Sequence, residues 1–358
     1  MYKRQQDHDT TPSIPGIAVD RVTAFVTDAV PDLVAPLDFH LIAGGRSNLT
    51  FAVTDANGRR VALRRPPVSH VLPTAHDMAR EFRLLSAIAP TGLPVPTPLA
   101  LCTDVAVNGA PFYVMEFVDG HILRTAEQAA SELTGAVRSA VGTELARTLA
   151  ALHAIDVDAV GLGDLARRDG YIERQVKRWL GQFEAMAVPG VDHGGIVEAV
   201  GAQLLATVPE PQRVSIVHGD YRLDNTVVND DGQVIAILDW EICTLGDPLA
   251  DLGTLLCYWA EPGDGPVALM DSPTLAEGFA TRDEVTAAYA AASGLDVSRA
   301  PYYTAFGFWR LACILQGVYA RYVGGAGAGD QGSVDGYPAH IRRLAELAQS
   351  TLAGDLAR

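Results

Sequence analysis

The sequence has few cysteines, few basic residues and no long apolar run. Its 4 cysteines are widely separated, without a Cys-x-x-Cys pair or a histidine at zinc-site spacing, so we expect reduced thiols and a cytoplasmic location. No apolar run reaches the roughly 20 residues that a membrane helix needs, which predicts that no membrane is a partner. The 27 Lys and Arg residues against 43 Asp and Glu residues give a net charge of −16. This charge argues against a nucleic-acid partner, whose recognition requires a basic face.

What remains is the composition of an ordinary globular protein. Hydrophobic residues make up 48% and charged residues 20% of the chain, so it should fold without an obligate protein partner. A length of 358 residues fits two lobes, each with its own core. The N-terminus is polar and lacks the apolar centre of a signal peptide. We expect a flexible tail over residues 1–18, an N-terminal lobe over 19–118 and a C-terminal lobe over 119–358.

The pattern of the N-terminal lobe predicts an antiparallel sheet. Short apolar segments are separated by turns, of which Asn57-Gly58 and Asn108-Gly109 carry strong turn signals. Apolar residues recur at helical spacing before the first strand and again before a proline-rich passage. The expected elements are helices over 19–34 and 77–88 and strands over 39–43, 49–54, 60–64 and 112–118. We place the crossover between the lobes at Asp119-Gly120, directly after the last strand.

The C-terminal lobe is mostly helical from Ala129 onward, and the segment Val214–Trp240 interrupts that pattern. Within this segment two apolar runs flank Asn229-Asp-Asp-Gly232, which predicts a β-hairpin. Pairing of its strands brings Asn225 and Asp239 together at the open end. An amide oxygen beside a carboxylate suits Mg²⁺, which favours oxygen ligands.

Asp220 lies on the loop that enters this hairpin, shortly before Asn225. There its carboxylate can accept a hydroxyl proton close to whatever the metal holds. Phosphoryl transfer requires little more than a metal, a base that orients the nucleophile and fixed positive charge. The segment therefore predicts chemistry on phosphate groups.

Three motifs follow one another in this half of the chain. They are His218-Gly-Asp220 with Asn225, then Asp239-Trp240, then Gly246-Asp-Pro-Leu-Ala-Asp-Leu252. The set resembles the aminoglycoside phosphotransferase and choline-kinase-like family. That resemblance implies an α+β, protein-kinase-like two-lobed fold, with a small antiparallel β N-lobe carrying one helix and a larger, mainly helical C-lobe that contains a catalytic β-hairpin. Residues 152–179 and 308–322 look most similar to the subgroup of kinase-like domains fused to acyl-CoA dehydrogenases.

The resemblance also implies a role for each matching residue. Asp220 corresponds to the catalytic base, and Asn225 and Asp239 correspond to the metal ligands. His218 and Asp251 correspond to structural braces, with Asp251 hydrogen-bonded to the catalytic loop.

The N-terminal lobe can be compared with the same family. There a glycine-rich loop covers the nucleotide phosphates. By position this loop corresponds to Gly44-Gly-Arg-Ser-Asn48, in which Gly44, Gly45, Ser47 and Asn48 are the candidate phosphate contacts. Two glycines and a serine between strands are also the composition of an ordinary hairpin.

The cation that kinases place on a nearby strand is replaced in this sequence. Val61-Ala-Leu-Arg64 corresponds to the kinase Val-Ala-Ile-Lys, with Glu81 as the natural partner of the cation. The only lysines of the chain, Lys3 and Lys177, lie elsewhere, so arginine must supply the charge. Strand parity favours Arg64 over Arg65, although a register shift by one residue would exchange them. A solvated edge arginine is the alternative for this position.

Three further residues have candidate roles. Arg222 is placed to stabilise charge on the transferred phosphate, or to form a surface ion pair. Glu116 and Phe117 correspond to the hinge whose backbone meets adenine, or simply to a strand end. Four residues of the helical lobe are candidates to line the acceptor pocket: Asp264, Tyr302, Tyr303 and Trp309.

Together these features predict a small-molecule kinase. It would use ATP and Mg to phosphorylate a hydroxyl of an amino sugar, a hydroxy acid or a hydroxyacyl compound. The alternative is a nucleotide-binding pseudokinase with a regulatory role, which only the missing lysine favours. A protein kinase is disfavoured, because no Ala-Pro-Glu segment follows Asp239-Trp240. The acceptor, the preference for ATP or GTP and the oligomeric state are not specified by these motifs.

Overall fold

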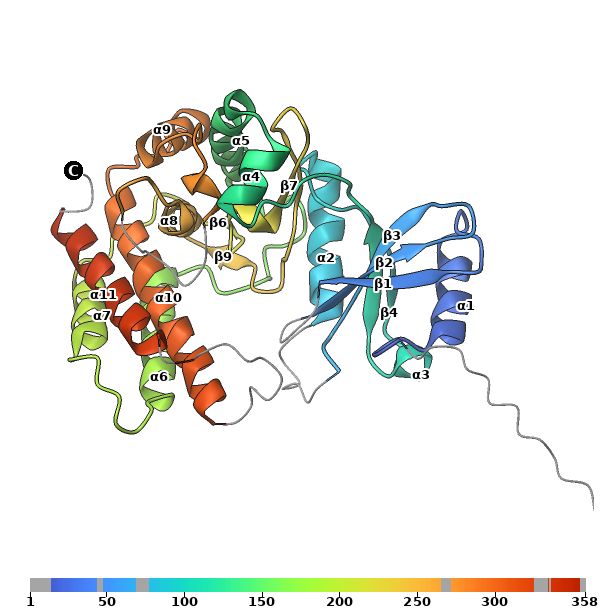
Figure 1. The fold of residues 1–358 in the computed structure, drawn as a ribbon, viewed down its shortest axis with the longest axis horizontal. Coiled ribbons are helices and arrows are strands. Elements are labelled where there is room, and N and C mark those ends of the chain that lie inside the picture. The colour runs from blue at the N-terminus through green and yellow to red at the C-terminus, as the bar shows by residue number, and fades with distance from the viewer. Residues whose placement is uncertain are drawn as a thin grey trace, which may run out of the picture. The chain divides into compact units, whose positions relative to one another are not determined.

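The computed structural model describes residues 14–43, 48–68, 77–264, 272–324, 334 and 336–354 (Figure 1). The chain divides into two compact units. The first comprises the described residues up to Ala89 together with Pro96–Val118. The second comprises Pro90–Val95 and the described residues from Asp119 onward. Most of the tail expected over residues 1–18 lies outside the described residues.

The first unit is an antiparallel sheet with helices on its faces (Figure 1). The strand order is β1-β2-β3-β5-β4. The strands are β1 (Asp38–Ala43), β2 (Leu49–Thr54), β3 (Arg60–Arg65), β4 (Pro98–Cys102) and β5 (Phe112–Glu116), and the helices are α1 (Val19–Ala29), α2 (Met78–Ile88) and α3 (Val105–Asn108).

Side-chain alternation along the strands separates two environments in this unit. Val61 and Leu63 of β3 belong to the apolar cluster that also contains Val22 and Val26 of α1. Successive strand residues point to opposite faces, so Arg64 lies on the other face of the sheet. That face carries α2, which contacts β4 and β5.

The ends of the elements follow local rules. Helix α1 was expected to reach residue 34 but ends at Ala29, because Val30 precedes Pro31 and a residue before proline disfavours the helical conformation. Helix α2 begins after Asp77, whose side chain accepts a hydrogen bond from the Arg80 amide.

The second unit is mainly helical and contains two small antiparallel sheets (Figure 1). Its helices are α4 (Ala126–Glu132), α5 (Gly135–Ala154), α6 (Tyr171–Ala185), α7 (Ile196–Ala206), α8 (Leu249–Tyr258), α9 (Arg282–Ser293), α10 (Ala300–Val323) and α11 (Tyr337–Ala353). Its strands are β6 (Ser215–Val217), paired with β9 (Thr244–Gly246), and β7 (Thr226–Val228), paired with β8 (Val234–Ile237). The helices of the described ranges include none with the length and hydropathy that crossing a membrane requires.

Helices α8 and α10 cross at very short range because glycines face each other. A Cβ atom on Gly253 would lie 2.2 Å from the Tyr303 carbonyl oxygen. A Cβ atom on Gly307 would lie 2.9 Å from the Gly253 carbonyl oxygen. Only glycine permits this approach, which fixes α10 against the helix that carries Asp251.

His121 connects the start of the second unit to the β7–β8 hairpin. Its backbone bridges Val228, with N···O distances of 2.8 and 2.9 Å. Its ring nitrogens lie 2.8 Å from carboxylate oxygens of Glu132 and of Asp230. The hydrogen bond to Asp230, more than that to Glu132, raises the pKa of His121 against a smaller opposing effect of burial.

We expect His121→Gln to destabilise the protein more at pH 6 than at pH 9. A raised folded-state pKa means that the stabilisation is complete below the unfolded value of about 6.5 and is lost as pH rises through the folded value. Because Asp230 is largely exposed, the effect should be only about 0.3–1 kcal/mol. Urea unfolding at both pH values measures it, with His40→Gln on β1 as the control. An equal loss at the two pH values would contradict the assignment.

Candidate active site

The loop between β6 and β7 is held by the carboxylate of Asp251. Asp251, in the first turn of α8, is fully buried. Its two oxygens accept hydrogen bonds from the backbone amides of His218 at 2.6 Å and Gly219 at 2.8 Å. Gly219 has φ +86°, a left-handed conformation that other residues rarely adopt, and the Asp251 contacts fix it.

The side chain of His153, on α5, is a third contact of this carboxylate. His153 Nε2 lies 3.3 Å from Asp251 Oδ2, and His153 Nδ1 lies 2.8 Å from the Tyr289 hydroxyl. Burial alone would raise the pKa of Asp251, but the contact with His153, together with the hydrogen bond from the Gly219 amide, outweighs burial and lowers the pKa. The loop is therefore anchored on an ionised carboxylate.

His218 joins this loop to the end of β8. Its Nε2 donates to the Leu238 carbonyl oxygen at 2.8 Å, and its Nδ1 accepts from the Asp220 amide at 3.3 Å. These contacts assign a neutral ring with the proton on Nε2. The ring also packs edge-on against Trp240, with 4.9 Å between the ring centroids. The His218 side chain thus contacts the Asp220 backbone and also Leu238 and Trp240, the two neighbours of Asp239.

Asp220 lies at the exposed side of this loop. Its Oδ2 accepts hydrogen bonds from Asn225 Nδ2 at 2.9 Å and from Arg222 Nε at 3.3 Å. The side chain is 26% exposed. Within the described residues its other carboxylate oxygen has no hydrogen-bond donor, so it can accept a proton from an incoming hydroxyl.

Arg222 is held between acidic and aromatic groups. Its Nη1 lies 3.1 Å from Asp224 Oδ2, and its guanidinium carbon lies 4.7 Å from the centroid of the Tyr258 ring. The side chain is 19% exposed. An arginine held this way presents a fixed positive charge beside Asp220.

The β7–β8 hairpin places Asn225 next to the segment of Asp239. Thr226 pairs with Ile237, and the Leu238 amide donates to the Asn225 carbonyl oxygen at 2.8 Å. Asp239 has φ +62°, unusual for a residue that is not glycine. Backbone strain of this kind is concentrated at functional sites.

The ligands available at this end of the hairpin are oxygens. Asn225 Nδ2 donates to the Asp220 carbonyl oxygen and carboxylate, both at 2.9 Å, so the amide oxygen is the atom of this side chain that could bind a metal. No cluster of three or more His, Cys, Asp or Glu residues able to bind a metal exists in the described part of the chain. An amide and a carboxylate fit Mg²⁺, which completes its coordination with water and phosphate oxygens.

In the first unit, Glu81 of α2 is the centre of a buried polar cluster. Glu81 Oε2 lies 3.0 Å from Arg64 Nε and 3.0 Å from the Tyr113 hydroxyl, and Oε1 accepts from Asn48 Nδ2 at 3.0 Å. Glu81 is 1% exposed. Since Thr50, Arg64 and Tyr113 are register partners across β2, β3 and β5, the sheet itself presents this arginine to α2.

Arg65 belongs to the other face of the sheet. Its guanidinium contacts the carbonyl oxygens of Gly16 and Pro66. Strand parity thus separates two adjacent arginines. Arg64 is the one whose contacts match the expected pair.

Other predicted nucleotide-binding residues are placed as follows. Gly44, Gly45 and Ser47 lie outside the described residues. The Asn48 side chain is buried and is used by Glu81. The Glu116 amide donates to the Thr97 carbonyl oxygen at 2.8 Å, and its carboxylate pairs with Arg59. Phe117 stacks under the Arg60 guanidinium at 4.2 Å.

The expected acceptor pocket was wrong for three aromatic residues. Trp309, Tyr303 and Tyr302 are buried, at 0%, 1% and 4% exposure, and donate hydrogen bonds within the second unit to Val197, Asp247 and Leu204. They form core rather than pocket. Asp264 forms an ion pair with Arg282.

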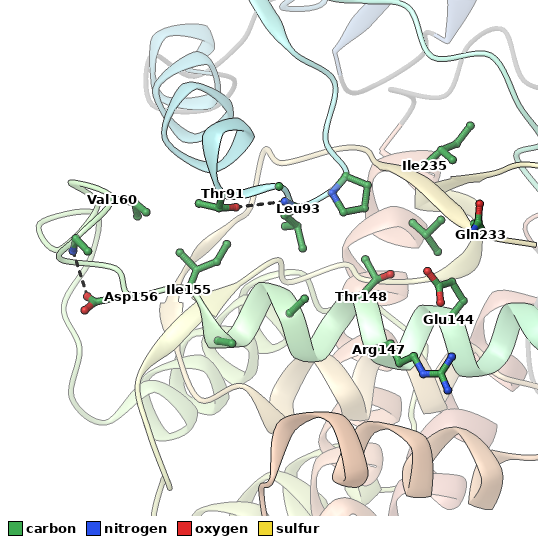
Figure 2. A pocket seen from close by; sticks show the side chains of 16 residues that line it. Thr91, Leu93, Glu144, Arg147, Thr148, Ile155, Asp156, Val160, Gln233 and Ile235 are labelled. Atoms are coloured by element: carbon green, nitrogen blue, oxygen red, sulfur yellow. Dashed lines mark hydrogen bonds between the residues drawn. The ribbon is translucent and has the colours of Figure 1, made fainter.

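A groove of about 890 Å³ in the second unit is separate from the loop between β6 and β7. Figure 2 shows its walls, formed by α5 with Thr148 and Glu144, by Leu93 and by Gln233 and Ile235 around β8. Neither the catalytic loop over 218–225 nor Asp239 lines it. The groove is therefore not a candidate for the phosphoryl-transfer centre.

Sequence comparisons place the chain in a family. The profile of the Phosphotransferase enzyme family matches residues 38–295. Acyl-CoA dehydrogenase family member 10 of Mus musculus is 35% identical over 294 residues, covering 81% of this chain and 27% of that protein. Acyl-CoA dehydrogenase family member 11 of Homo sapiens is 33% identical over 283 residues, covering 78% and 36%. The chain thus spans well under half of each relative.

Solved structures agree with this assignment. A Ralstonia eutropha protein, provisionally called an aminoglycoside phosphotransferase, has a TM-score of 0.76 at 30% identity and covers 94% of this chain and 98% of that one. A choline kinase of Cryptosporidium parvum shares the fold, with a TM-score of 0.64 at 12% identity over 94% and 97% of the two chains.

The chain belongs to the phosphotransferase enzyme family. It is an enzyme of the small-molecule kinase class, and the predicted kinase-like fold, with its antiparallel sheet and mostly helical second unit, is confirmed.

Proposed function

We propose that the chain transfers the γ-phosphoryl group of ATP to a hydroxyl of a small molecule, with Asp220 as the base. The observation that carries the proposal is the arrangement of the catalytic loop. Asp251 and His218 fix the backbone around Asp220, and the hairpin sets Asn225 beside the segment of Asp239. We assign nucleotide binding to residues 19–118 and transfer to residues 119–358.

Each residue has a defined part in this reaction. Asp220 accepts the hydroxyl proton as the acceptor oxygen forms a bond to the γ-phosphorus and the bond to the bridging oxygen of ADP breaks. Asn225 and Asp239 would hold Mg²⁺, which when bound neutralises charge on phosphate oxygens. Arg222 stabilises negative charge on the transferred group.

The first unit carries a fixed positive charge of its own. Arg64 is oriented by Glu81, as the lysine of a kinase is oriented by its glutamate, and its guanidinium can bind phosphate oxygens. The hinge residues Glu116 and Phe117 and the loop residues Gly44, Gly45, Ser47 and Asn48 remain the proposed nucleotide contacts. A cytoplasmic setting is part of the proposal, supported by 4 buried free cysteines.

For the acceptor we propose a hydroxy acid or a hydroxyacyl compound, ahead of an amino sugar. The two relatives are named acyl-CoA dehydrogenases, so their kinase-like part accompanies acyl chemistry. The amino sugar is the acceptor suggested by the name of the Ralstonia eutropha protein.

An acceptor panel tests the proposal. Purified protein is incubated with Mg·ATP and hydroxy acids, their coenzyme A thioesters or amino sugars, and ADP release is followed. We expect ADP release that depends on both the acceptor and Mg²⁺, with omission of the metal as the control. Nucleotide binding without acceptor-dependent ADP release, for every compound, would instead support the pseudokinase, which the replacement of lysine by Arg64 favours.

A further inference from the structure

We propose that Arg310 is a positioning residue that holds the catalytic loop through the Gly219 carbonyl, in addition to the hold of Asp251 on the Gly219 amide. Arg310 lies on α10, outside the sequence motifs of the active site. Its Nη2 donates to the Gly219 carbonyl oxygen at 2.6 Å. The catalytic part of this inference rests on the proposed function, because Gly219 directly precedes Asp220.

The burial of Arg310 requires an explanation. The residue is 7% exposed and lies among buried side chains of α10, including Phe306 and Trp309, which precede it. Moving a guanidinium out of water is unfavourable unless hydrogen bonds compensate, and an apolar side chain of similar volume would fill such a position at lower cost. We therefore explain the charged side chain at this buried position by its hydrogen bond to the Gly219 carbonyl oxygen.

Gly219 is held through both of its backbone polar groups by opposite charges. Its amide donates to Asp251 Oδ1 at 2.8 Å, and its carbonyl accepts from Arg310. Glycine has the widest range of backbone conformations, and here it adopts φ +86°. The peptide between Gly219 and Asp220 is also held at both of its polar groups, through the Gly219 carbonyl by Arg310 at 2.6 Å and through the Asp220 amide by His218 at the longer distance of 3.3 Å. Arg310 therefore makes the shorter of the two contacts that set the peptide plane from which Asp220 departs.

The close crossing of α8 and α10 brings Arg310 to this carbonyl. Gly307 packs on Gly253 one helical turn before Arg310. Thr254 follows Gly253, and its hydroxyl oxygen lies 3.4 Å from Arg310 Nη2. That hydroxyl already donates to the Ala250 carbonyl oxygen at 2.9 Å, so it cannot replace the arginine as a donor to Gly219.

Two substitutions of Arg310 test the inference. Arg310→Met removes the donor, and Arg310→Lys keeps the charge but loses the planar donor geometry. Thr304→Val is the matched control, since Thr304 is equally buried on α10 and its hydroxyl donates within that helix, to the Ala300 carbonyl oxygen. Each protein is measured for kcat, for the KM of Mg·ATP and for hydrogen exchange of the peptide over residues 216–222.

For Arg310→Met we expect kcat to fall roughly 10²-fold, with the KM of Mg·ATP within about threefold, because a small displacement of the base affects transfer rather than binding. Arg310→Lys should lose about tenfold in kcat. In both variants the 216–222 peptide should exchange faster, while Thr304→Val should match the wild type in all three measurements.

Other outcomes would overturn the inference. If Arg310→Met folds and has wild-type kcat and wild-type exchange of the 216–222 peptide, the inference is wrong. If Arg310→Met does not fold, wild-type kcat and wild-type exchange in Arg310→Lys would show the same. If the wild-type protein transfers no phosphate at all, the proposed function fails. The exchange measurement still decides in that event whether Arg310 holds the loop.

Discussion

Replacing Asp220 by asparagine should lower kcat for phosphoryl transfer by roughly 10²–10⁴-fold. The amide keeps the size of the side chain and can still contact Asn225 and Arg222, but it cannot accept the hydroxyl proton. The open carboxylate oxygen is the feature that is lost. Binding of Mg·ATP should change little, because neither proposed metal ligand is altered. Steady-state kinetics with the best acceptor of the panel, combined with calorimetric titration of Mg·ATP, separates the two effects.

Asp231→Asn is the matched control for this substitution. Asp231 is an exposed carboxylate in the turn of the same hairpin, so its neutralisation changes the net charge equally without touching the loop. We expect wild-type kcat for this variant. A turnover of Asp220→Asn within a few-fold of the control would rule out Asp220 as the base.

Asp251→Asn is expected to cost about 3–5 kcal/mol in the free energy of unfolding. The buried carboxylate accepts hydrogen bonds from His218, Gly219 and His153. An amide in its place lacks the negative charge, and its NH₂ group would face one of these three hydrogen-bond donors. Because the folded-state pKa of Asp251 is lowered, its stabilisation is present above the unfolded value of about 3.9 and is lost as pH falls below it. The difference in stability between wild type and variant should therefore be constant from pH 7 to about pH 5 and shrink below pH 4.

Asp247→Asn provides the comparison for urea unfolding at these pH values. Asp247 is also buried, but burial raises its pKa despite the 2.6 Å hydrogen bond from the Tyr303 hydroxyl. Because the fold disfavours the charged form of Asp247, replacing this carboxyl by an amide should lower the free energy of unfolding less than the same replacement at Asp251. Equal losses at Asp247 and Asp251 would contradict the view that the Asp251 charge anchors the loop.

Local rules were sufficient for much of the fold. The spacing of apolar residues and the Asn57-Gly58 turn predicted the ranges of β1, β2, β3 and β5 of the first unit but not that of β4. Strand parity favoured Arg64 over Arg65 and left a register shift by one residue open, and the observed pairing places Arg64 against Glu81. The hairpin that joins Asn225 to the segment of Asp239 followed from its turn residues. Such features depend on neighbours in sequence, so the sequence reports them directly.

Contacts between distant segments could not be predicted in this way. His153 contacts Asp251, which holds the catalytic loop, and Arg310 contacts the loop itself. Both come from helices far from the loop in sequence, through packing that no local pattern specifies. A partial signal existed for both, since each is a lone polar residue on an apolar stretch of helix. The prediction of the acceptor pocket was wrong for the same reason, because the aromatic residues proposed to line it are equally suited to the core.

Transfer of radiolabel from [γ-³²P]ATP tests the central claim most directly. The purified protein, Mg²⁺ and a hydroxylated acceptor are mixed, and the labelled products are separated and identified by mass spectrometry. We expect label on the acceptor hydroxyl with the wild-type protein and with Asp231→Asn, and almost none with Asp220→Asn. Label that remains on ATP, or appears only as inorganic phosphate with every acceptor tried, would contradict the claim.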